Sequence, residues 1–304
     1  MDEKTLTLRD GKKMFYRVWT VDNPIATLHI NHGMAEHSLR YDYFAREMNK
    51  LGYVVYAQDH RGHGYTIEGD EEGWFAEKDG WSIICDDSFE LDQLIAREFP
   101  NVKHFIFGHS MGSFLTRCNL SRHSEVYDAA VICGTGASQG LAGKVGRSLA
   151  RSRAKSHGSK AKAPIMDTLA FGSFSKKFKG EGKMSWLSSD KVEVEKYNND
   201  PLCGFICSNM FYADLIEGSF TANDKLLIDK VRKDLPIFFI SGELDPVGGY
   251  SKGVNKVVDL YRSAGIKDVR KKLYDKGRHE ILNDIMRDEV ISDVSAFYGE
   301  FVGE

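Results

Sequence analysis

Short apolar runs alternate with longer helical patterns along most of this chain, and this alternation limits the folds open to it. The apolar runs have the length of buried strands and lie at residues 26–30, 53–57, 104–107, 129–133, 237–240 and 269–274. Helical patterns lie between or after them, at residues 40–51, 81–98, 111–120, 252–264 and 281–298. A series of this kind predicts an α/β fold, with a mostly parallel central sheet and helices on both faces.

Two segments depart from this series. Residues 5–8 and 13–19 are predicted strands joined by Asp10-Gly11, which is typical of an antiparallel hairpin. From 136 to 233 the strand–helix alternation disappears, and between Lys144 and Lys183 there are eleven Lys/Arg but only two acidic residues. We interpret 136–233 as an inserted helical cap between two parts of one core, 1–135 and 234–304.

The most specific local pattern is Gly108-His109-Ser110-Met111-Gly112, between an apolar run and a helical pattern. In this context G-x-S-x-G marks a tight strand-to-helix turn that projects the serine hydroxyl above the sheet. The two glycines let the backbone bend and the helix pack closely. Ser110 is therefore the candidate nucleophile. The alternative is a serine that only caps a helix.

A serine hydroxyl is a weak nucleophile at neutral pH and needs a base, which an acid must orient. In hydrolases built on such a sheet, the acid and then the base follow the serine, each directly after a strand. Asp245 follows the fifth apolar run and His279 follows the sixth. We predict Asp245 as the acid and His279 as the base. Glu243 and Asp234 are competitors for the acid, although Asp234 precedes its strand and would lie at the wrong end.

Acyl transfer also needs two backbone N–H groups that face the developing oxyanion. One is expected from Met111, directly after the candidate nucleophile. The other is expected from Met34, in the loop after the first apolar run. These amides are free for this role because they lie outside the hydrogen bonding of the sheet.

Three segments together carry a family resemblance: His32-Gly33-Met34-Ala35-Glu36-His37-Ser38, Asp59-His60-Arg61-Gly62-His63-Gly64, and the G-x-S-x-G segment. They resemble the monoacylglycerol lipase and lysophospholipase branch of the α/β-hydrolase superfamily. The resemblance covers nearly the whole chain and is weakest in the cap. It implies a serine hydrolase that cleaves fatty-acyl esters with the triad Ser110, Asp245 and His279, the oxyanion donors Met34 and Met111, and no metal or other cofactor.

Two alternatives to this interpretation remain open. A short-chain carboxylesterase, thioesterase or amide hydrolase would use the same triad and differ only in pocket shape. A peptidase or a non-catalytic binding protein on this fold is a further alternative. The turn at 59–64 is expected to be structural, and a metal site at His60 and His63 is its alternative.

Aromatic residues of the cap are candidate substrate-binding residues. They could pack the cap onto the core, line an acyl pocket above Ser110, or form a basic amphipathic surface that touches anionic membranes. The candidates are Phe171, Phe174, Phe178, Trp186, Phe211 and Tyr212.

Composition restricts the partners of the protein. The 41 Lys and Arg residues against 44 Asp and Glu residues give a net charge of -3, whereas a nucleic-acid binder usually carries a basic excess. The five scattered cysteines favour reduced thiols in a cytoplasmic protein over a disulfide framework. We expect a cytoplasmic enzyme for a small acyl ester or lipid, with no nucleic acid and a weak peripheral membrane contact through the cap. The oligomeric state is not predicted.

Overall fold

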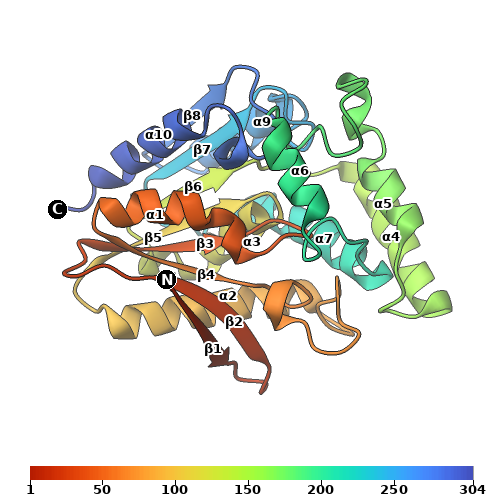
Figure 1. Ribbon diagram of the computed structural model, residues 1–304, viewed down its shortest axis with the longest axis horizontal. Helices are drawn as coiled ribbons and strands as arrows, with labels where there is room; N and C mark the ends of the chain where they lie inside the picture. The colour runs from red at the N-terminus through yellow and green to blue at the C-terminus, as the bar shows by residue number, and fades with distance from the viewer. Residues whose placement is uncertain (304) are drawn as a thin grey trace.

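The computed structural model describes residues 1–303, and these contain an eight-stranded sheet in the order β1-β2-β4-β3-β5-β6-β7-β8 (Figure 1). The strands are β1 (Asp2–Thr7), β2 (Lys13–Trp19), β3 (Ala26–Asn31), β4 (Tyr53–Gln58), β5 (Lys103–His109), β6 (Ala129–Cys133), β7 (Ile237–Gly242) and β8 (Val269–Tyr274). β2 pairs antiparallel with β1 and with β4, and all other pairs are parallel. The predicted mostly parallel sheet and the predicted hairpin are both confirmed, and the hairpin lies at one edge of the sheet.

The predicted strands agree with the observed ones to within a few residues. The bounds of β2, β6 and β8 are as predicted, whereas β5 continues two residues further, to His109. The extension occurs because Gly108 and His109 still pair with Ile132 and Cys133 of β6. The sheet therefore supports the chain up to the residue before Ser110.

Helices cover both faces of this sheet. α1 (Asp42–Lys50) and α10 (Arg287–Gly299) bury their apolar sides against one face. α2 (Gly80–Glu98), α3 (Met111–His123) and α9 (Lys252–Ser263) cover the other. Among residues 1–303 we find no helix that has both the length and the apolar character needed to cross a membrane.

The closing helix predicted at 281–298 is wrong at its start. The chain forms a short 3-10 helix η5 (Ile281–Asn283), and α10 begins only at Arg287. Asp284 separates them because its backbone is extended and its carboxylate accepts hydrogen bonds from the N–H groups of Arg278 and Ile285. Similarly, η1 (Ser38–Tyr41) precedes α1, where one helix was predicted from residue 40.

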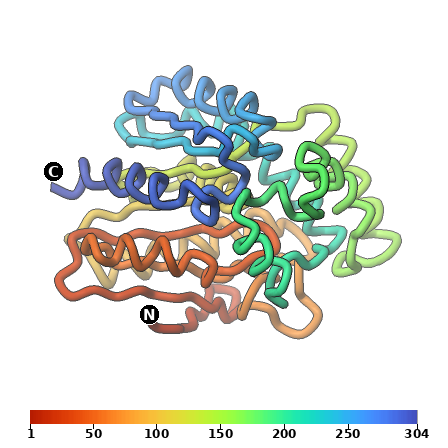
Figure 2. Tube along the Cα trace, turned by 45° about the horizontal axis from the view of Figure 1, so that its top comes forward, coloured from red at the N-terminus to blue at the C-terminus, as the bar shows by residue number. Residues whose placement is uncertain are grey.

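The segment between β6 and β7 is helical and lies beside the end of the sheet where β5 and β7 finish (Figures 1 and 2). Its helices are α4 (Gly140–His157), α5 (Pro164–Phe171), η4 (Phe174–Lys177), α6 (Lys191–Asn199), α7 (Asn209–Ala222) and α8 (Lys225–Ile228). Two further short 3-10 helices, η2 (Gly64–Thr66) and η3 (Ser124–Val126), lie outside this segment. We call residues 136–233 the cap, and their separation from the core as a domain stays a prediction.

Candidate active site

Ser110 occupies the turn between β5 and α3, with φ 53° and ψ -117°. A non-glycine residue in this region costs about 1–3 kcal/mol of strain, which the surrounding structure must offset. A Cβ at Gly108 would collide with the side chain of Thr116 and the carbonyl of Gly112. A Cβ at Gly112 would collide with the carbonyl of Asn31 at the end of β3. Both glycines are therefore required, because β3, β5 and α3 meet at this point.

His279 lies between Ser110 and Asp245. Its Nε2 is 2.8 Å from Ser110 Oγ, and its Nδ1 is 3.0 Å from Asp245 Oδ1. The second contact has the distance of an ion pair but not the alignment of a hydrogen bond, as is common in catalytic sites before substrate binds. The buried carboxylate of Asp245 also accepts hydrogen bonds from Val247 N–H at 2.8 Å and from the Ser241 hydroxyl at 3.2 Å. The structure thus brings together three predicted residues from the loops after β5, β7 and β8.

The two competitors for the acid lie at the surface. Glu243 is exposed, and Asp234 is exposed and pairs with Arg232 at 3.0 Å. Asp245 is the acidic residue that contacts the His279 ring, so the geometry favours it over both.

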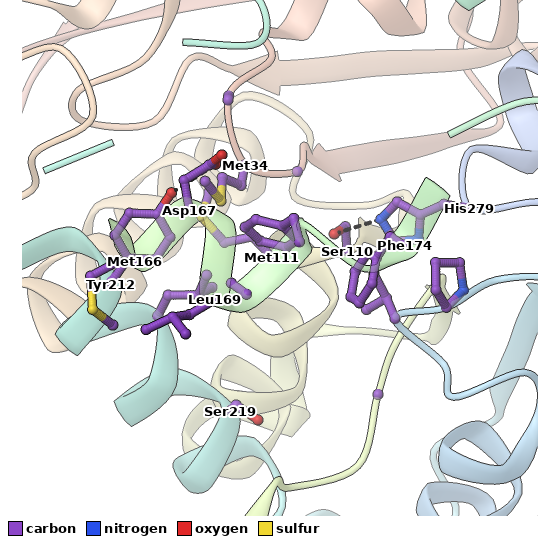
Figure 3. Close-up of a pocket in the computed structure, with 18 of the residues that line it drawn as sticks. Met34, Ser110, Met111, Met166, Asp167, Leu169, Phe174, Tyr212, Ser219 and His279 are labelled. Carbon is purple, nitrogen blue, oxygen red and sulfur yellow. Dashed lines mark hydrogen bonds between the residues drawn. The ribbon is translucent and has the colours of Figure 1, made fainter. Parts of the chain in front are cut away.

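Met34 lies in the loop after β3, residues 32–37, which we call the Met34 loop. Met111 is the first residue of α3. Within residues 1–303, neither backbone N–H donates a hydrogen bond to another protein group. The loop passes close to the serine, since a Cβ built on Gly33 would lie 3.2 Å from Ser110 Cβ. Figure 3 shows Met34 and Met111 near Ser110, and both amides are thus available to a ligand there.

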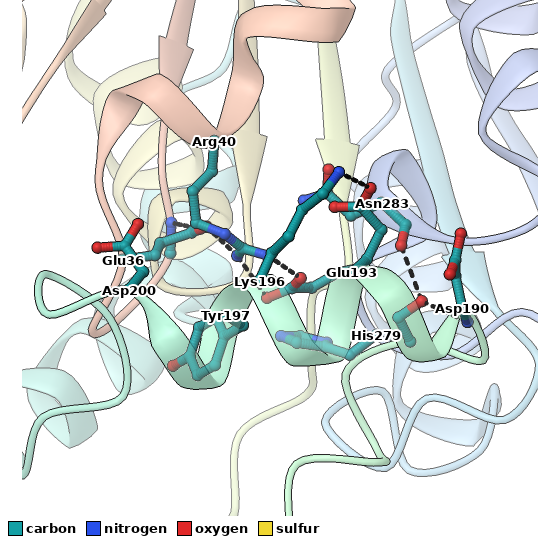
Figure 4. A network of polar contacts seen from close by, with 12 residues as sticks. Glu36, Arg40, Asp190, Glu193, Lys196, Tyr197, Asp200, His279 and Asn283 are labelled. Atoms are coloured by element: carbon teal, nitrogen blue, oxygen red, sulfur yellow. Dashed lines mark hydrogen bonds and ion pairs between the residues drawn. The ribbon is translucent and has the colours of Figure 1, made fainter.

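A buried charge network joins the Met34 loop to the loop after β8 (Figure 4). Glu36 accepts hydrogen bonds from Gly33 N–H at 2.5 Å and from Arg40 at 2.7 Å. Arg40 also donates to both carboxylate oxygens of Glu280, at 2.8 and 2.6 Å. Burial opposes ionisation of Glu36, but the hydrogen bond from His109 and the charge of Arg40 outweigh it and hold its pKa well below the usual value.

This network was missed from the sequence. Glu36 lies inside the first of the three recognised segments, but a sequence pattern does not distinguish a buried carboxylate from an exposed one. Arg40 and Glu280 are 240 positions apart, and only the fold brings them together.

A cavity of about 1040 Å³ extends from Ser110 into the cap (Figure 3). Most of the residues that line it are aliphatic or aromatic, and α4, α5 and α7 contribute to its wall. Four of the predicted substrate-binding residues line it: Phe171, Phe174, Trp186 and Tyr212. Residues missed from the sequence also line it, namely Leu141, Val145, Leu149, Met166, Leu169 and Phe220.

The other two candidates, Phe178 and Phe211, lie outside the cavity wall. Phe178 is buried beneath the Arg278 guanidinium, which lies 4.0 Å from the ring centre. Phe211 is fully buried, with its ring centre 4.8 Å from that of Phe75 in the core. Both pack the cap onto the core. Phe171 and Phe174 belong to different helices, because α5 ends at Phe171 and η4 begins at Phe174.

The histidines of the turn at 59–64 bond to the backbone. His60 Nε2 lies 3.2 Å from the carbonyl of His32, and His63 Nδ1 lies 2.9 Å from the carbonyl of Arg61. Burial lowers the pKa of His63 to about 4, so the ring is neutral and its N–H donates. These contacts favour the structural role over the metal site.

Comparison with known proteins places the chain in a family. Residues 22–286 match the family model described as serine aminopeptidase, S33 (Hydrolase_4). A monoacylglycerol lipase of Mycolicibacterium smegmatis is 25% identical over 293 residues, which cover 94% of this chain and 93% of the relative. Human monoglyceride lipase is 25% identical over 281 residues, covering 91% of this chain and 82% of the relative. The structure of a carboxyl esterase from Bacillus coagulans in complex with glycerol has a TM-score of 0.92 at 27% identity, covering 99% of this chain and 98% of that one. The chain therefore belongs to the serine aminopeptidase, S33, family and is an α/β-hydrolase of its monoacylglycerol lipase-like branch.

Proposed function

We propose that this carboxylic-ester hydrolase cleaves fatty-acyl esters, monoacylglycerols or lysophospholipids, through an acyl-enzyme on Ser110. The observation that carries the proposal is the 2.8 Å contact between Ser110 Oγ and His279 Nε2 at one end of a largely apolar cavity of about 1040 Å³. Ligand cavities commonly measure about 300–1,000 Å³, so this one has room for a single-chain lipid.

The mechanism follows from the contacts of the three residues. His279 takes the Ser110 proton as Oγ attacks the acyl carbonyl, and Asp245 stabilises the resulting imidazolium. The N–H groups of Met34 and Met111 bind the oxyanion. His279 then protonates the leaving alcohol. Water attacks the acyl-enzyme with His279 as base and releases the fatty acid and the free serine.

The named relatives support an ester of glycerol as substrate. Two are a monoacylglycerol lipase and a monoglyceride lipase, and the Bacillus coagulans esterase was solved with glycerol. The same triad could also serve a short-chain carboxylesterase, a thioesterase or an amide hydrolase. The carboxyl esterase, with its TM-score of 0.92, is the observation that favours this second candidate.

Acyl-chain length separates the two candidates. We would measure kcat/KM for esters from two to eighteen carbons, including glycerol monoesters, lysophospholipids and matched thioesters and amides, with Ser110→Ala as the blank. Each buried methylene contributes up to about 0.8 kcal/mol, so kcat/KM should rise up to about tenfold for every two carbons until the cavity is full. An optimum at two to four carbons would contradict the lipase proposal and support the short-chain esterase.

A weak membrane contact through the cap is part of the proposal. Leu141, Val145 and Leu169 line the cavity and have exposed fractions of 77%, 63% and 66%. Lys144, one position before Val145 on α4, is exposed as well. An apolar patch with a basic neighbour is suited to the surface of an anionic bilayer. Such a contact would bring the cavity close to its lipid substrate.

We also propose a cytoplasmic location. The five cysteines, Cys85, Cys118, Cys133, Cys203 and Cys207, are free thiols, and four of them are buried. Unpaired thiols are typical of a reducing compartment. Alkylation of freshly lysed cells under denaturing conditions would test this, with five labelled thiols expected.

A further inference from the structure

The ring of His279 has an aromatic neighbour from the cap. The Trp186 indole lies 5.2 Å from the imidazole, centre to centre, with 36° between the planes. Cations within about 6 Å of an aromatic ring centre are attracted to its face. The imidazole becomes a cation when it takes the serine proton, so the indole stands where it can act on the protonated form of the base.

The indole is held in this place by contacts on both sides. The carbonyl of Trp186 accepts the His279 N–H at 3.3 Å, and the carbonyl of Leu187 accepts the Glu280 N–H at 2.7 Å. On the cap side, the indole is parallel to the Phe171 ring, with 4° between the planes, at 6.0 Å, and it meets the Phe174 ring edge-on at 5.1 Å. The backbone pairing and the two rings fix the orientation of the indole toward His279.

We propose that Trp186 is a positioning residue that stabilises the imidazolium form of His279 in the transition state, an inference that rests on the proposed Ser110 mechanism. A wall residue that only contacted the acyl chain would not need a ring so near the base. Because His279 is only 2% exposed, water does little to screen this attraction.

Other ionisable groups also act on the His279 ring and stay unchanged in variants of Trp186. The Asp245 carboxylate, 3.0 Å from Nδ1, attracts a positive ring, whereas the neighbouring Glu280 is paired with Arg40. His109 opposes the positive ring when protonated, with its ring centre 4.8 Å away. Glu36 and Arg40 act on it through His109 and Glu280. The guanidinium of Arg278, the residue before His279, lies over the Phe178 ring. A change in pH dependence in a Trp186 variant therefore reports on the indole.

The test compares Trp186→Leu and Trp186→Phe, using a p-nitrophenyl butyrate probe whose acyl chain is too short to fill the cavity. In Trp186→Leu, we expect kcat to fall roughly 5- to 30-fold. The acid limb of the kcat/KM profile should move to lower pH, because the imidazolium has lost a stabilising neighbour. Trp186→Phe keeps an aromatic face, so its kcat and the pH of its acid limb should stay close to those of the wild type.

Phe220→Leu is the matched control, since the Phe220 ring lines the same cavity but packs against Arg147, at 5.1 Å, and not against the indole. Its acid limb should stay at the wild-type pH, whatever happens to KM. An unchanged kcat and acid limb in Trp186→Leu, with only a raised KM, would overturn the inference and leave Trp186 as a pocket wall. A shift of the acid limb to higher pH would overturn it as well.

Two further measurements keep the result interpretable. If Trp186→Leu fails to fold by circular dichroism, Trp186→Met takes its place, with a lower kcat and an acid limb at lower pH supporting the inference and an unchanged kcat and acid limb overturning it. If the wild-type protein hydrolyses no acyl ester, or Ser110→Ala keeps the activity, the proposed function itself fails. That outcome is distinct from an active wild type whose Trp186 variants show no shift.

Discussion

The carbonyl of Ala35 accepts a hydrogen bond from the N–H of Gly204 at 2.9 Å. Ala35 follows Met34 and has a φ of 51°, whereas Gly204 belongs to the cap. The hydroxyl of Tyr197, at 3.1 Å, donates to the same carbonyl. The cap therefore does more than cover the cavity, because it also holds the loop that supplies one proposed oxyanion donor.

Removing the Tyr197 hydroxyl should loosen the Met34 loop. Tyr197→Phe loses one buried hydrogen bond, which contributes about 0.5–1.5 kcal/mol. We expect kcat for a glycerol monoester to fall about 2- to 10-fold with a small change in KM, since the loss acts on the oxyanion donor. Steady-state kinetics would measure it. Tyr43→Phe, which removes an exposed hydroxyl bonded to Asp288, is the control, and an equal loss there would contradict this role.

Asp245→Asn should leave the fold intact and nearly abolish turnover. Asparagine cannot stabilise the positive His279 ring as a carboxylate does, and such a change typically lowers kcat by about ten-thousandfold. Glu243→Gln, two positions away and exposed, removes the same charge and should keep kcat within about twofold. A comparable loss in both variants would show that Asp245 is not the acid.

Gly112→Ala should destabilise the fold. The added methyl would collide with the carbonyl of Asn31, and overpacking of this kind costs about 1–3 kcal/mol or more. Urea unfolding would measure the change. Gly299→Ala places its methyl where no atom lies within 4 Å, so its unfolding free energy should stay within about 0.5 kcal/mol of wild type. A neutral Gly112→Ala would refute the close approach of α3 and β3.

Asp214 should make stability depend on pH near neutrality. Burial between α7 and α2 raises its pKa to about 7, and its Oδ2 has no hydrogen-bond partner among residues 1–303. The folded protein thus keeps a proton that the unfolded chain releases near pH 4. The stability from this proton is complete below about pH 4 and is lost as pH rises through about 7.

Asp214→Asn stays neutral at every pH and removes this dependence. We expect its Tm to exceed that of wild type by about 2–5 °C at about pH 8, and to match wild type at about pH 4. Thermal scans at both pH values would measure the difference. Asp22→Asn removes an exposed charge and is the control. A lower Tm than wild type at pH 8 would contradict the assignment.

The proposed membrane contact predicts a loss of vesicle binding in Leu141→Ser. Leu141 is 77% exposed at the mouth of the cavity, and removing it takes away part of the apolar patch. Cosedimentation with phosphatidylglycerol vesicles should fall several-fold. Leu226→Ser in α8 is the matched control, because Leu226 is 74% exposed and does not line the cavity. Equal binding by both variants and wild type would exclude α4 as the contact.

The sequence by itself determined the strand order along the chain, the hairpin and the positions of Ser110, Asp245 and His279. Strand and turn signals are local, because they depend on side-chain periodicity and on glycines at a sharp bend. The acid and base could be named because each follows a strand, and parallel strands end at the same edge of the sheet. Their roles in catalysis stay predictions that the variants above test.

Only the tertiary structure decided which cap residues line the cavity and which pack against the core. Phe178 and Phe211 resemble Phe174 and Tyr212 in the sequence, yet the first two are buried in contacts with the core and the second two line the cavity. The cap has no strand series to order it, so its contacts depend on packing between residues far apart in the chain. The Ala35–Gly204 hydrogen bond and the placement of Trp186 beside His279 arise in the same way, since they join segments that only the folded chain brings into contact.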